Sequence, residues 1–366
     1  MRLSSFLRIL SLSWVGVLVA LTQPVAIHAQ GSGIPISAPG HQCASPVIAI
    51  SANGIVHMAW EQEDGIWYRR LQNGVLSPLE KISSEGENPT LAVDPYGEIA
   101  YLAWEQAFDG NYEIFTRKWD ARQGWLAPHN VSDNAGGSTS PTLAISNLGV
   151  LHLIWSDTTP GVRTLYHAIS TNGESWPVAT PIPEARGSHP SAAIDAQGVL
   201  RVAWQDRASF SENFRIWTAY QENGAWHTPV ALTDGSAQAF SPQLASQGDM
   251  TLLVWQEGAQ SVLAALQDDA WKRIRIQSGA SPALAILESG TLAWAWETEQ
   301  ELTREHYRAY AWVSTTWGAF QPRHPDLFAH GGQIGIVWAE NRTTGQQIFY
   351  SYDMPATIYQ PVLIHH

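Results

Sequence analysis

The chain has 366 residues, of which 33 are acidic and 20 are basic, and its net charge at neutral pH is −13. A field of this sign repels polyphosphate, and no basic block interrupts it, so nucleic acid and anionic membrane surfaces are not expected as partners. Cys43 is the only cysteine in the sequence. It cannot form a disulfide within the chain, so stability must come from packing.

Residues 1–29 have the composition of an export signal peptide. Arg2 and Arg8 give a positive start, an apolar run over residues 9–21 follows, and Ala29 offers a small residue at the cleavage site. The apolar run is shorter than the roughly 20 residues that cross a bilayer, and no later stretch is comparable. We therefore expect a secreted, extracellular protein without a membrane span, for which a bacterial cell surface is a compatible location.

Three landmarks recur seven times in the rest of the chain. Tryptophans recur at intervals of 41 to 51 residues: Trp60, Trp104, Trp155, Trp204, Trp255, Trp296 and Trp338. A proline precedes each tryptophan by 13 to 15 residues: Pro46, Pro89, Pro141, Pro190, Pro242, Pro282 and Pro325. A glycine precedes each tryptophan by six or seven residues: Gly54, Gly97, Gly149, Gly198, Gly248, Gly290 and Gly332. A repeated unit of this length decides the whole fold.

Each repeat is predicted to contain four strands. An apolar strand follows the proline, as in residues 47–50, and the glycine then supplies the positive φ of a hairpin turn. A second strand runs into the tryptophan, as in residues 56–60, and an aromatic third strand follows, as in residues 66–68. The fourth strand is expected to begin near a further tryptophan in five repeats: Trp125, Trp176, Trp226, Trp271 and Trp317.

This arithmetic predicts an all-β fold, a seven-bladed β-propeller of four-stranded antiparallel blades over residues 33–354, with a short C-terminal tail at residues 355–366. A six-bladed propeller is the alternative. Only six fourth strands lie between the repeats, so one blade must borrow a strand from a terminus. We expect residues 33–37 to complete the last blade and to close the ring, which removes an exposed sheet edge. Residues 357–364 are the alternative donor.

The turns between third and fourth strands resemble those of a known family. Ser170-Thr171-Asn172-Gly173-Glu174-Ser175-Trp176 and Glu222-Asn223-Gly224-Ala225-Trp226 are similar to degenerate Asp-boxes, the turns of bacterial neuraminidase-type repeats in sialidase-like propellers. The strand ends Trp204-Gln205-Asp206-Arg207 and Trp338-Ala339-Glu340-Asn341-Arg342 resemble the same group of secreted proteins. The aspartate of a full Asp-box is replaced here by Thr171 or Asn172. The resemblance implies architecture, because Asp-boxes in that group are structural turns and many of its members are not enzymes.

The resemblance also implies what an enzyme of sialidase type would need. Three arginines grip the carboxylate of the substrate, a glutamate assists a tyrosine nucleophile, and an aspartate is the acid. The arginine of the first blade lies in an Arg-Ile-Pro stretch in that group. Its nearest counterpart here is Phe214-Arg215-Ile216-Trp217, which we interpret as an ordinary third strand.

In a propeller, the loops from second to third strands and from one blade to the next share one face, which is the usual binding face. The candidate ligand-binding residues on this face are Gln62, Asp109, Tyr112, Asp157, Asp206, Arg207, Glu257, Glu340 and Arg342. Four of them are acids two residues after a repeat tryptophan: Asp157, Asp206, Glu257 and Glu340. Such a ring of carboxylates suits a cation or sugar hydroxyls, but its recurrence favours side chains that accept hydrogen bonds at strand ends.

No metal or cofactor is expected. His57 and His152 occupy one repeat position in different blades, which diverge around a ring, whereas zinc needs ligands that converge on one point. No phosphate-binding glycine loop, Ser-His-Asp arrangement or cysteine-based metal spacing stands out, and no catalytic residue is assigned.

We therefore expect a secreted, non-catalytic recognition propeller that binds a glycan or an extracellular protein through its acidic loop face. The first alternative is a divergent sialidase-type glycoside hydrolase, in which Arg207, Arg342 and a third arginine converge on a tyrosine at the channel mouth. The second alternative is a surface scaffold or assembly protein that is presented through its tail, residues 359–366.

Overall fold

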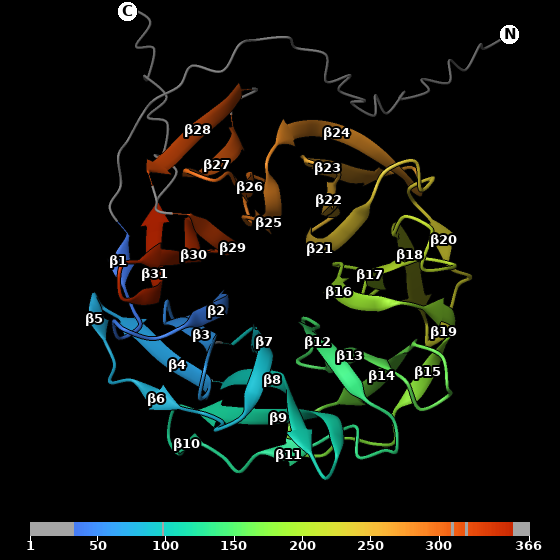
Figure 1. Cartoon of the computed structure of the whole chain (residues 1–366), viewed down its shortest axis with the longest axis horizontal. Helices are drawn as coiled ribbons and strands as arrows, with labels where there is room; N and C mark the ends of the chain where they lie inside the picture. Colours follow the sequence, from blue (N-terminus) through green and yellow to red (C-terminus); the bar gives the residue numbers. More distant parts are fainter. Residues whose placement is uncertain (1–32, 97–98, 309–310, 319–320, 354–366) are drawn as a thin grey trace, which may run out of the picture.

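The structure is a computed structural model that describes residues 33–353, apart from positions 97–98, 309–310 and 319–320. Within these residues the regular secondary structure consists of β-strands alone. The strands form seven antiparallel sheets, which are arranged as blades around a central channel (Figure 1). This confirms the all-β, seven-bladed β-propeller, and the six-bladed alternative is wrong. In the part of the chain so described, no helix is long and apolar enough to span a membrane. The predicted signal peptide and C-terminal tail lie outside it.

We number the blades in chain order, and each has the same two strands nearest the channel. The innermost strands contain the repeat prolines: β2 (Cys43–Ile50), β7 (Gly86–Val93), β12 (Ser138–Ile145), β16 (Ser188–Ile194), β21 (Ala239–Gln247), β25 (Ala280–Ile286) and β29 (Pro322–His330). The second strands contain the repeat tryptophans: β3 (Val56–Gln62), β8 (Ile99–Phe108), β13 (Leu151–Asp157), β17 (Leu200–Asp206), β22 (Met250–Glu257), β26 (Leu292–Glu297) and β30 (Gln333–Arg342).

The outer halves of the blades differ more from one another. The third strands are β4 (Gly65–Gln72), β9 (Asn111–Asp120), β14 (Thr164–Ser170), β18 (Arg215–Glu222), β23 (Gln260–Gln267), β27 (Glu301–Arg308) and β31 (Gly345–Asp353). Unbroken fourth strands are β15 (Thr180–Arg186), β24 (Ala270–Ser278) and β28 (Ala311–Gly318). In blades 1, 2 and 4 the fourth strand is split into β5 (Val75–Leu76) and β6 (Glu80–Lys81), β10 (Gly124–Trp125) and β11 (His129–Asn130), and β19 (Ala225–Trp226) and β20 (Val230–Ala231). Pro78, Pro128 and Pro229 lie between the pieces, and proline interrupts a ladder because it lacks an N–H.

The predicted starts of the fourth strands hold in part. Trp125, Trp226 and Trp271 lie in the first two residues of β10, β19 and β24. The prediction is wrong for Trp317, which lies near the end of β28 and pairs with Leu302, whereas Trp312 lies near the start of that strand. β28 begins at Ala311, which pairs with Arg308, so the first of the two tryptophans of this strand marks its start.

The chain closes the ring with its N-terminal strand, as predicted for residues 33–37. β1 (Ile34–Pro35) pairs antiparallel with β31, and the partners are Ile34 with Tyr350 and Pro35 with Phe349. The N–H of Ile348 donates a hydrogen bond of 2.9 Å to the Ser37 hydroxyl, which extends the pairing. Blade 7 is thus a sheet of β29, β30, β31 and β1. The alternative donor, residues 357–364, lies outside the described part of the chain.

The seven repeat tryptophans occupy equivalent places between blades. All are at most 6% exposed. Trp104 packs on Ala59 and Tyr68 of blade 1, and Trp155 packs on Tyr101 and Ala103 of blade 2, so each indole faces the preceding blade. The repeat glycines that the structure describes have φ between 59° and 80°, which confirms the turn prediction for Gly54, Gly149, Gly198, Gly248, Gly290 and Gly332.

Candidate functional site at the channel mouth

A ring of left-handed residues surrounds one end of the channel, and we call it the pre-proline ring. Each member directly precedes a repeat proline and has φ between 47° and 55°: Ser45, Asn88, Ser140, His189, Ser241, Ser281 and His324. A β-bulge interrupts each innermost strand at this point, as between Glu87 and Thr90. A non-glycine residue in this region carries strain of about 1–3 kcal/mol, so seven such residues make the channel mouth a strained and defined rim.

At each bulge a backbone N–H group is left without a partner in its own sheet. In five blades a side chain of the preceding blade accepts a hydrogen bond from this N–H group. The residue after a repeat tryptophan reaches the next blade, because its side chain points away from the side that the indole occupies. The N–H of Asn88 donates to Glu61 Oε2 at 3.2 Å, and the N–H of Ser241 donates to Gln205 Oε1 at 2.9 Å. The same hydrogen bond recurs at three more blade boundaries, in the pairs Ser140 with Glu105, Ser281 with Gln256 and His324 with Glu297.

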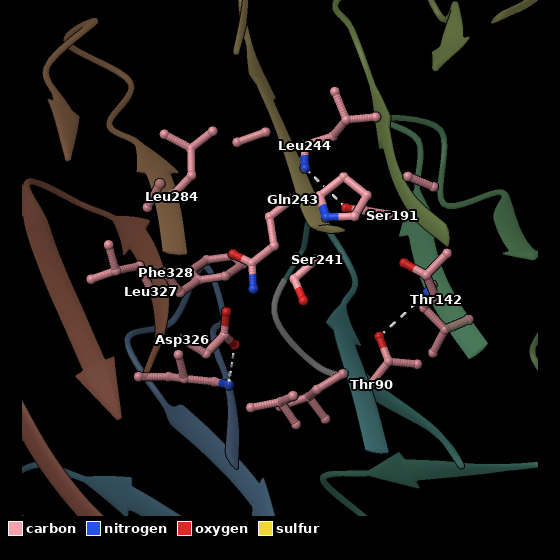
Figure 2. Close-up of a pocket in the computed structure, with 18 of the residues that line it drawn as sticks. Thr90, Thr142, Ser191, Ser241, Gln243, Leu244, Leu284, Asp326, Leu327 and Phe328 are labelled. Carbon is pink, nitrogen blue, oxygen red and sulfur yellow. Dashed lines mark hydrogen bonds between the residues drawn. The ribbon is translucent and has the colours of Figure 1, made fainter. Parts of the chain in front are cut away.

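The channel is a cavity of about 670 Å³ that the seven innermost strands line. The residue after the repeat proline lines the channel in six of the blades, and three of these side chains bridge to the next blade (Figure 2). Their oxygens accept backbone N–H groups in the pairs Thr90 with Leu143 at 3.4 Å, Ser191 with Leu244 at 2.9 Å, and Asp326 with Ile48 at 3.0 Å. Burial raises the pKa of Asp326 to about 7.

Three carboxylates and a phenol meet on blades 1 and 2 at the channel mouth, and we call Glu61, Glu87, Asn88, Glu105 and Tyr112 the Glu105 cluster. Glu87 and Glu105 are directly opposite each other on β7 and β8. Asn88 Nδ2 donates to Glu105 Oε1 at 3.0 Å, and the Tyr112 hydroxyl donates to Glu87 Oε1 at 3.4 Å. Like charges directly opposite each other destabilise a sheet, so stability alone does not explain this arrangement.

The surroundings of Glu105 raise the pKa of this carboxyl group. Glu105 is only 6% exposed. Burial is the main cause that raises its pKa above the usual range, and the charges of Glu87 and Glu61 raise it further, against hydrogen bonds from Ser140 and Asn88 that lower it. The charge of Glu87 is also the main cause of the raised pKa of Tyr112. Among the described residues, no lysine or arginine lies within ion-pair distance of Glu61, Glu87 or Glu105.

Three of the four acids two residues after a repeat tryptophan bind the indole of that tryptophan. Asp157, Glu257 and Glu340 accept the indole N–H of Trp155, Trp255 and Trp338 at 3.0, 2.9 and 3.4 Å. Asp157 is fully buried and also accepts from Asn134, Ser138 and Thr159. Burial alone would raise the pKa of Asp157, and these hydrogen bonds together lower it. This is the hydrogen-bonding role that the recurrence favours.

Asp206 is the exception among these four acids. The indole N–H of Trp204 donates instead to the backbone oxygen of Arg186 at 2.6 Å. Burial raises the pKa of Asp206, and the N–H of Arg207 and the charge of Arg186 lower it. Asp206 therefore does not bind the indole of its repeat tryptophan, unlike the other three acids.

The structure does not bring Arg207 and Arg342 together. Arg207 belongs to blade 4 and Arg342 to blade 7, which lie on opposite sides of the ring (Figure 1). Arg342 forms an ion pair of 2.9 Å with Glu340, and its guanidinium lies 4.7 Å from the ring centre of Phe349. A carboxylate grip that needs both arginines is not formed here.

The remaining predicted residues are Gln62, Asp109 and Tyr112, and they have different environments. Gln62 is buried and donates to Asp64 at 2.9 Å, and Asp109 is an exposed turn residue with φ of 49°. Tyr112 is the one candidate that belongs to the Glu105 cluster. Sequence reasoning missed Glu61 and Glu105, although both directly follow a repeat tryptophan, because the acids that recur most often lie one position later.

His57 and His152 are each hydrogen-bonded to a neighbouring ring within their own blade. His57 Nδ1 lies 2.6 Å from the Tyr68 hydroxyl, and His152 Nδ1 lies 2.9 Å from His167 Nε2. Burial lowers the pKa of His57 to about 3 and that of His152 to about 4. Across the described residues, no three His, Cys, Asp or Glu side chains are grouped so as to hold a metal ion.

The turn after β14 is organised by its polar side chains. Asn172 Oδ1 accepts the N–H groups of Glu174 and Ser175, each at 2.9 Å, and the Ser170 hydroxyl accepts the N–H of Gly173 at 2.9 Å. The turn joins a third to a fourth strand, so it lies at the end of the blade away from the Glu105 cluster. Its assignment as an Asp-box stays a prediction.

Known proteins resemble this chain in structure. No family model matches the sequence, and no curated protein matches it either. An α-L-arabinanase of Penicillium chrysogenum in complex with arabinobiose superimposes with a TM-score of 0.54 and 13% identity, over 89% of this chain and 98% of that one. The Hadza microbial sialidase Hz136 superimposes with a TM-score of 0.54 and 11% identity, over 83% and 74% of the two chains. The GH93 α-L-arabinofuranosidase of Fusarium graminearum with arabinobiose gives a TM-score of 0.51 and 12% identity, over 88% and 96%. The fold is a sialidase-like β-propeller.

Proposed function

We propose that the protein is a glycoside hydrolase that acts on a neutral glycan at the channel mouth, with Glu105 as the proton donor. The observation that carries the proposal is the direct opposition of Glu87 and Glu105 on β7 and β8 without a neutralising cation among the described residues. Glycoside hydrolysis uses two carboxyl groups whose environments push their pKa values apart, one as acid and one as base or nucleophile. Structurally similar propellers include an arabinanase and a sialidase, which supports the same class of chemistry.

The carboxyl group of Glu105 is not needed for the bond between blades. Gln205 and Gln256 occupy the same position in blades 4 and 5, and their amide oxygens accept the corresponding N–H groups at 2.9 and 3.3 Å. A buried acid where an amide performs the structural task is a candidate for chemistry. Glu297 is a third acid in this position, but Arg323 lies 3.8 Å from its carboxylate.

In the proposed reaction, Glu105 donates its proton to the glycosidic oxygen as the glycosidic bond breaks, and Glu87 acts as the base or nucleophile on the sugar side. The Tyr112 hydroxyl donates to Glu87 and so orients this carboxylate for its role as base or nucleophile. Burial is the main cause that raises the pKa of Glu105, and the charges of Glu87 and Glu61 raise it further, which suits Glu105 to the role of proton donor.

A neutral substrate fits this site better than an acidic sugar. A sugar carboxylate would meet the charges of Glu61 and Glu87, and Arg207 and Arg342 lie on opposite sides of the ring (Figure 1). Arabinobiose, the ligand of the similar Penicillium chrysogenum arabinanase, carries no charge. We therefore propose arabinan-type or other uncharged polysaccharides rather than sialosides.

The matched pair Glu105→Gln and Glu297→Gln tests the proposal. Both variants keep an acceptor for the bond between blades, so both are expected to fold with unchanged circular dichroism. Glu105→Gln should lower kcat/KM on linear arabinan or another neutral polysaccharide by about 10²–10⁴-fold, the usual contribution of a general acid. Glu297→Gln should retain nearly full activity. Equal rates in the two variants would refute the role of Glu105.

Glycan recognition without hydrolysis is the second candidate. The observation that favours it is the burial of Glu105, which leaves the carboxyl group little access to a substrate. The same protein samples decide between the two: recognition predicts that wild type and Glu105→Gln retain a polysaccharide equally in affinity gels and that neither releases reducing sugar.

We also propose that the protein acts outside the cytoplasm. The export-type composition of residues 1–29 supports this location. Expression of the full chain in a bacterium, followed by fractionation and N-terminal sequencing, should yield protein outside the cytoplasm that starts near Gln30.

A further inference from the structure

The longest loop between a second and a third strand lies in blade 4 and carries an exposed aromatic platform. Residues 207–214 join β17 to β18, so they lie on the same face as the Glu105 cluster. Phe210 is 92% exposed. The guanidinium carbon of Arg207 lies 4.8 Å from the ring centre of Phe210 and 4.6 Å from that of Phe214. Arg207 therefore contacts both rings at cation–π distance.

The end of this loop is fixed to the next blade junction. Asn213 Nδ2 donates to the backbone oxygen of Gly235 at 2.9 Å, and the N–H of Phe214 donates to Gln238 Oε1 at 2.9 Å. These two hydrogen bonds fix the backbone at Asn213 and Phe214, and Arg207 contacts the rings of both Phe214 and Phe210. A loop end that is already fixed loses less conformational entropy when a ligand binds beside it.

We propose that Phe210 stacks on a sugar ring of the glycan and forms a subsite separate from Glu105. The chemistry of the platform matches both parts of a sugar: the phenyl ring suits the apolar C–H face, and the guanidinium suits the hydroxyl groups on its edge. Among the described residues, no carboxylate lies within ion-pair distance of Arg207, so the N–H donors of this side chain are not committed to an ion pair. The inference rests on the proposed glycan specificity and adds where the chain of sugars is held.

The position of the platform predicts a dependence on glycan length. The Glu105 cluster belongs to blades 1 and 2 and the platform to blade 4, and blade 3 lies between them (Figure 1). Because blade 3 separates the two places, we expect a disaccharide at the Glu105 cluster not to contact Phe210, whereas a polysaccharide can occupy both places. Loss of the platform should weaken the binding of polymers and leave the turnover of short substrates unchanged.

Affinity electrophoresis in gels that contain linear arabinan, galactan, xylan or mixed-linkage β-glucan tests the inference. The variants are Phe210→Ala, Phe210→Trp and the matched control Leu148→Ala, which removes an exposed side chain (86%) from a turn at the opposite face. We expect at least one polymer to retard wild type, Phe210→Ala to weaken that binding about tenfold or more, and Phe210→Trp and Leu148→Ala to bind as wild type does.

Two different results would overturn the inference, and they are distinguishable. If a polymer retards wild type and Phe210→Ala equally, the platform has no role while the proposed function stands. If no polymer retards or is cleaved by wild type, the proposed function fails and the platform inference fails with it.

Discussion

The side-chain carboxylate of Asp326 in blade 7 accepts the backbone N–H of Ile48 in blade 1, across the junction where the propeller closes. The same position in blades 2 and 4 carries Thr90 and Ser191, whose neutral hydroxyls make the equivalent bond. The closing junction therefore differs from these two by holding a group that titrates. Burial raises the pKa of Asp326 to about 7, from 3.8 for an exposed aspartate.

The Asp326→Asn variant should remove a pH dependence of stability. Between pH 3.8 and about 7 the folded state binds more protons at this site than the unfolded chain, so the stability of wild type falls as pH rises through this window. The slope is at most about 1.4 kcal/mol per pH unit. The amide of asparagine accepts the same N–H without titrating, so the variant should become more stable than wild type near pH 8.

Urea unfolding at pH 5 and pH 8 measures this difference. Thr90→Val is the control, because it removes an equivalent bond without a titratable group and should lower stability by the same amount at both values of pH. A difference between wild type and Asp326→Asn that is the same at pH 5 and pH 8 would contradict the prediction.

Asp157→Ala should destabilise the protein far more than Asp109→Ala, although both acids belong to the loop face. Asp157 is fully buried and accepts hydrogen bonds from Trp155, Asn134, Ser138 and Thr159, so its removal leaves several buried donors without a partner. We expect a loss on the order of 3 kcal/mol or more, against less than about 0.5 kcal/mol for the exposed Asp109. Chemical denaturation of the two variants measures both losses. Similar values would count against the role of Asp157 as a buried hydrogen-bond acceptor.

Glu61→Gln should move the alkaline limb of the pH–rate profile to lower pH. The charge of Glu61 is one of the causes that raise the pKa of Glu105, and the glutamine keeps an acceptor for the N–H of Asn88. With that charge removed, Glu105 loses its proton at lower pH, so the protonated acid that hydrolysis needs disappears earlier. Profiles of kcat/KM from pH 4 to 8 on a neutral polysaccharide test this, and an unchanged limb would show that Glu105 does not set it.

Ser37→Ala should weaken the closure of blade 7. The Ser37 hydroxyl is buried and accepts the N–H of Ile348, and the variant leaves that donor without its partner. The expected loss is about 1–3 kcal/mol. Ser289→Ala, at an exposed turn, is the control and should change the unfolding midpoint little. Hydrogen exchange of the Ile348 amide reports the closure directly, and full protection in Ser37→Ala would refute the assignment.

The architecture was predictable because its causes repeat along the chain. Proline, glycine and tryptophan each serve one backbone or packing task per blade, so seven occurrences reinforce one another. The Glu105 cluster has no such repetition: the position of Glu105 holds Ser156 in blade 3 and Ala339 in blade 7. The opposition of Glu87 and Glu105 depends on a bulge that shifts the register by an amount that spacing alone does not reveal.

Closure by the N-terminal strand also sets an order of events during synthesis. Ser37 and Ile348 are 311 positions apart, so a growing chain carries β1 without its partner until almost the whole propeller has been made. A sheet edge that waits this long is open to pairing with other chains. β1 is only two residues long, and Pro35 lacks an N–H, which limits what such an edge offers to a foreign strand. We therefore expect the brevity of this strand to limit aggregation of nascent molecules before the ring is complete.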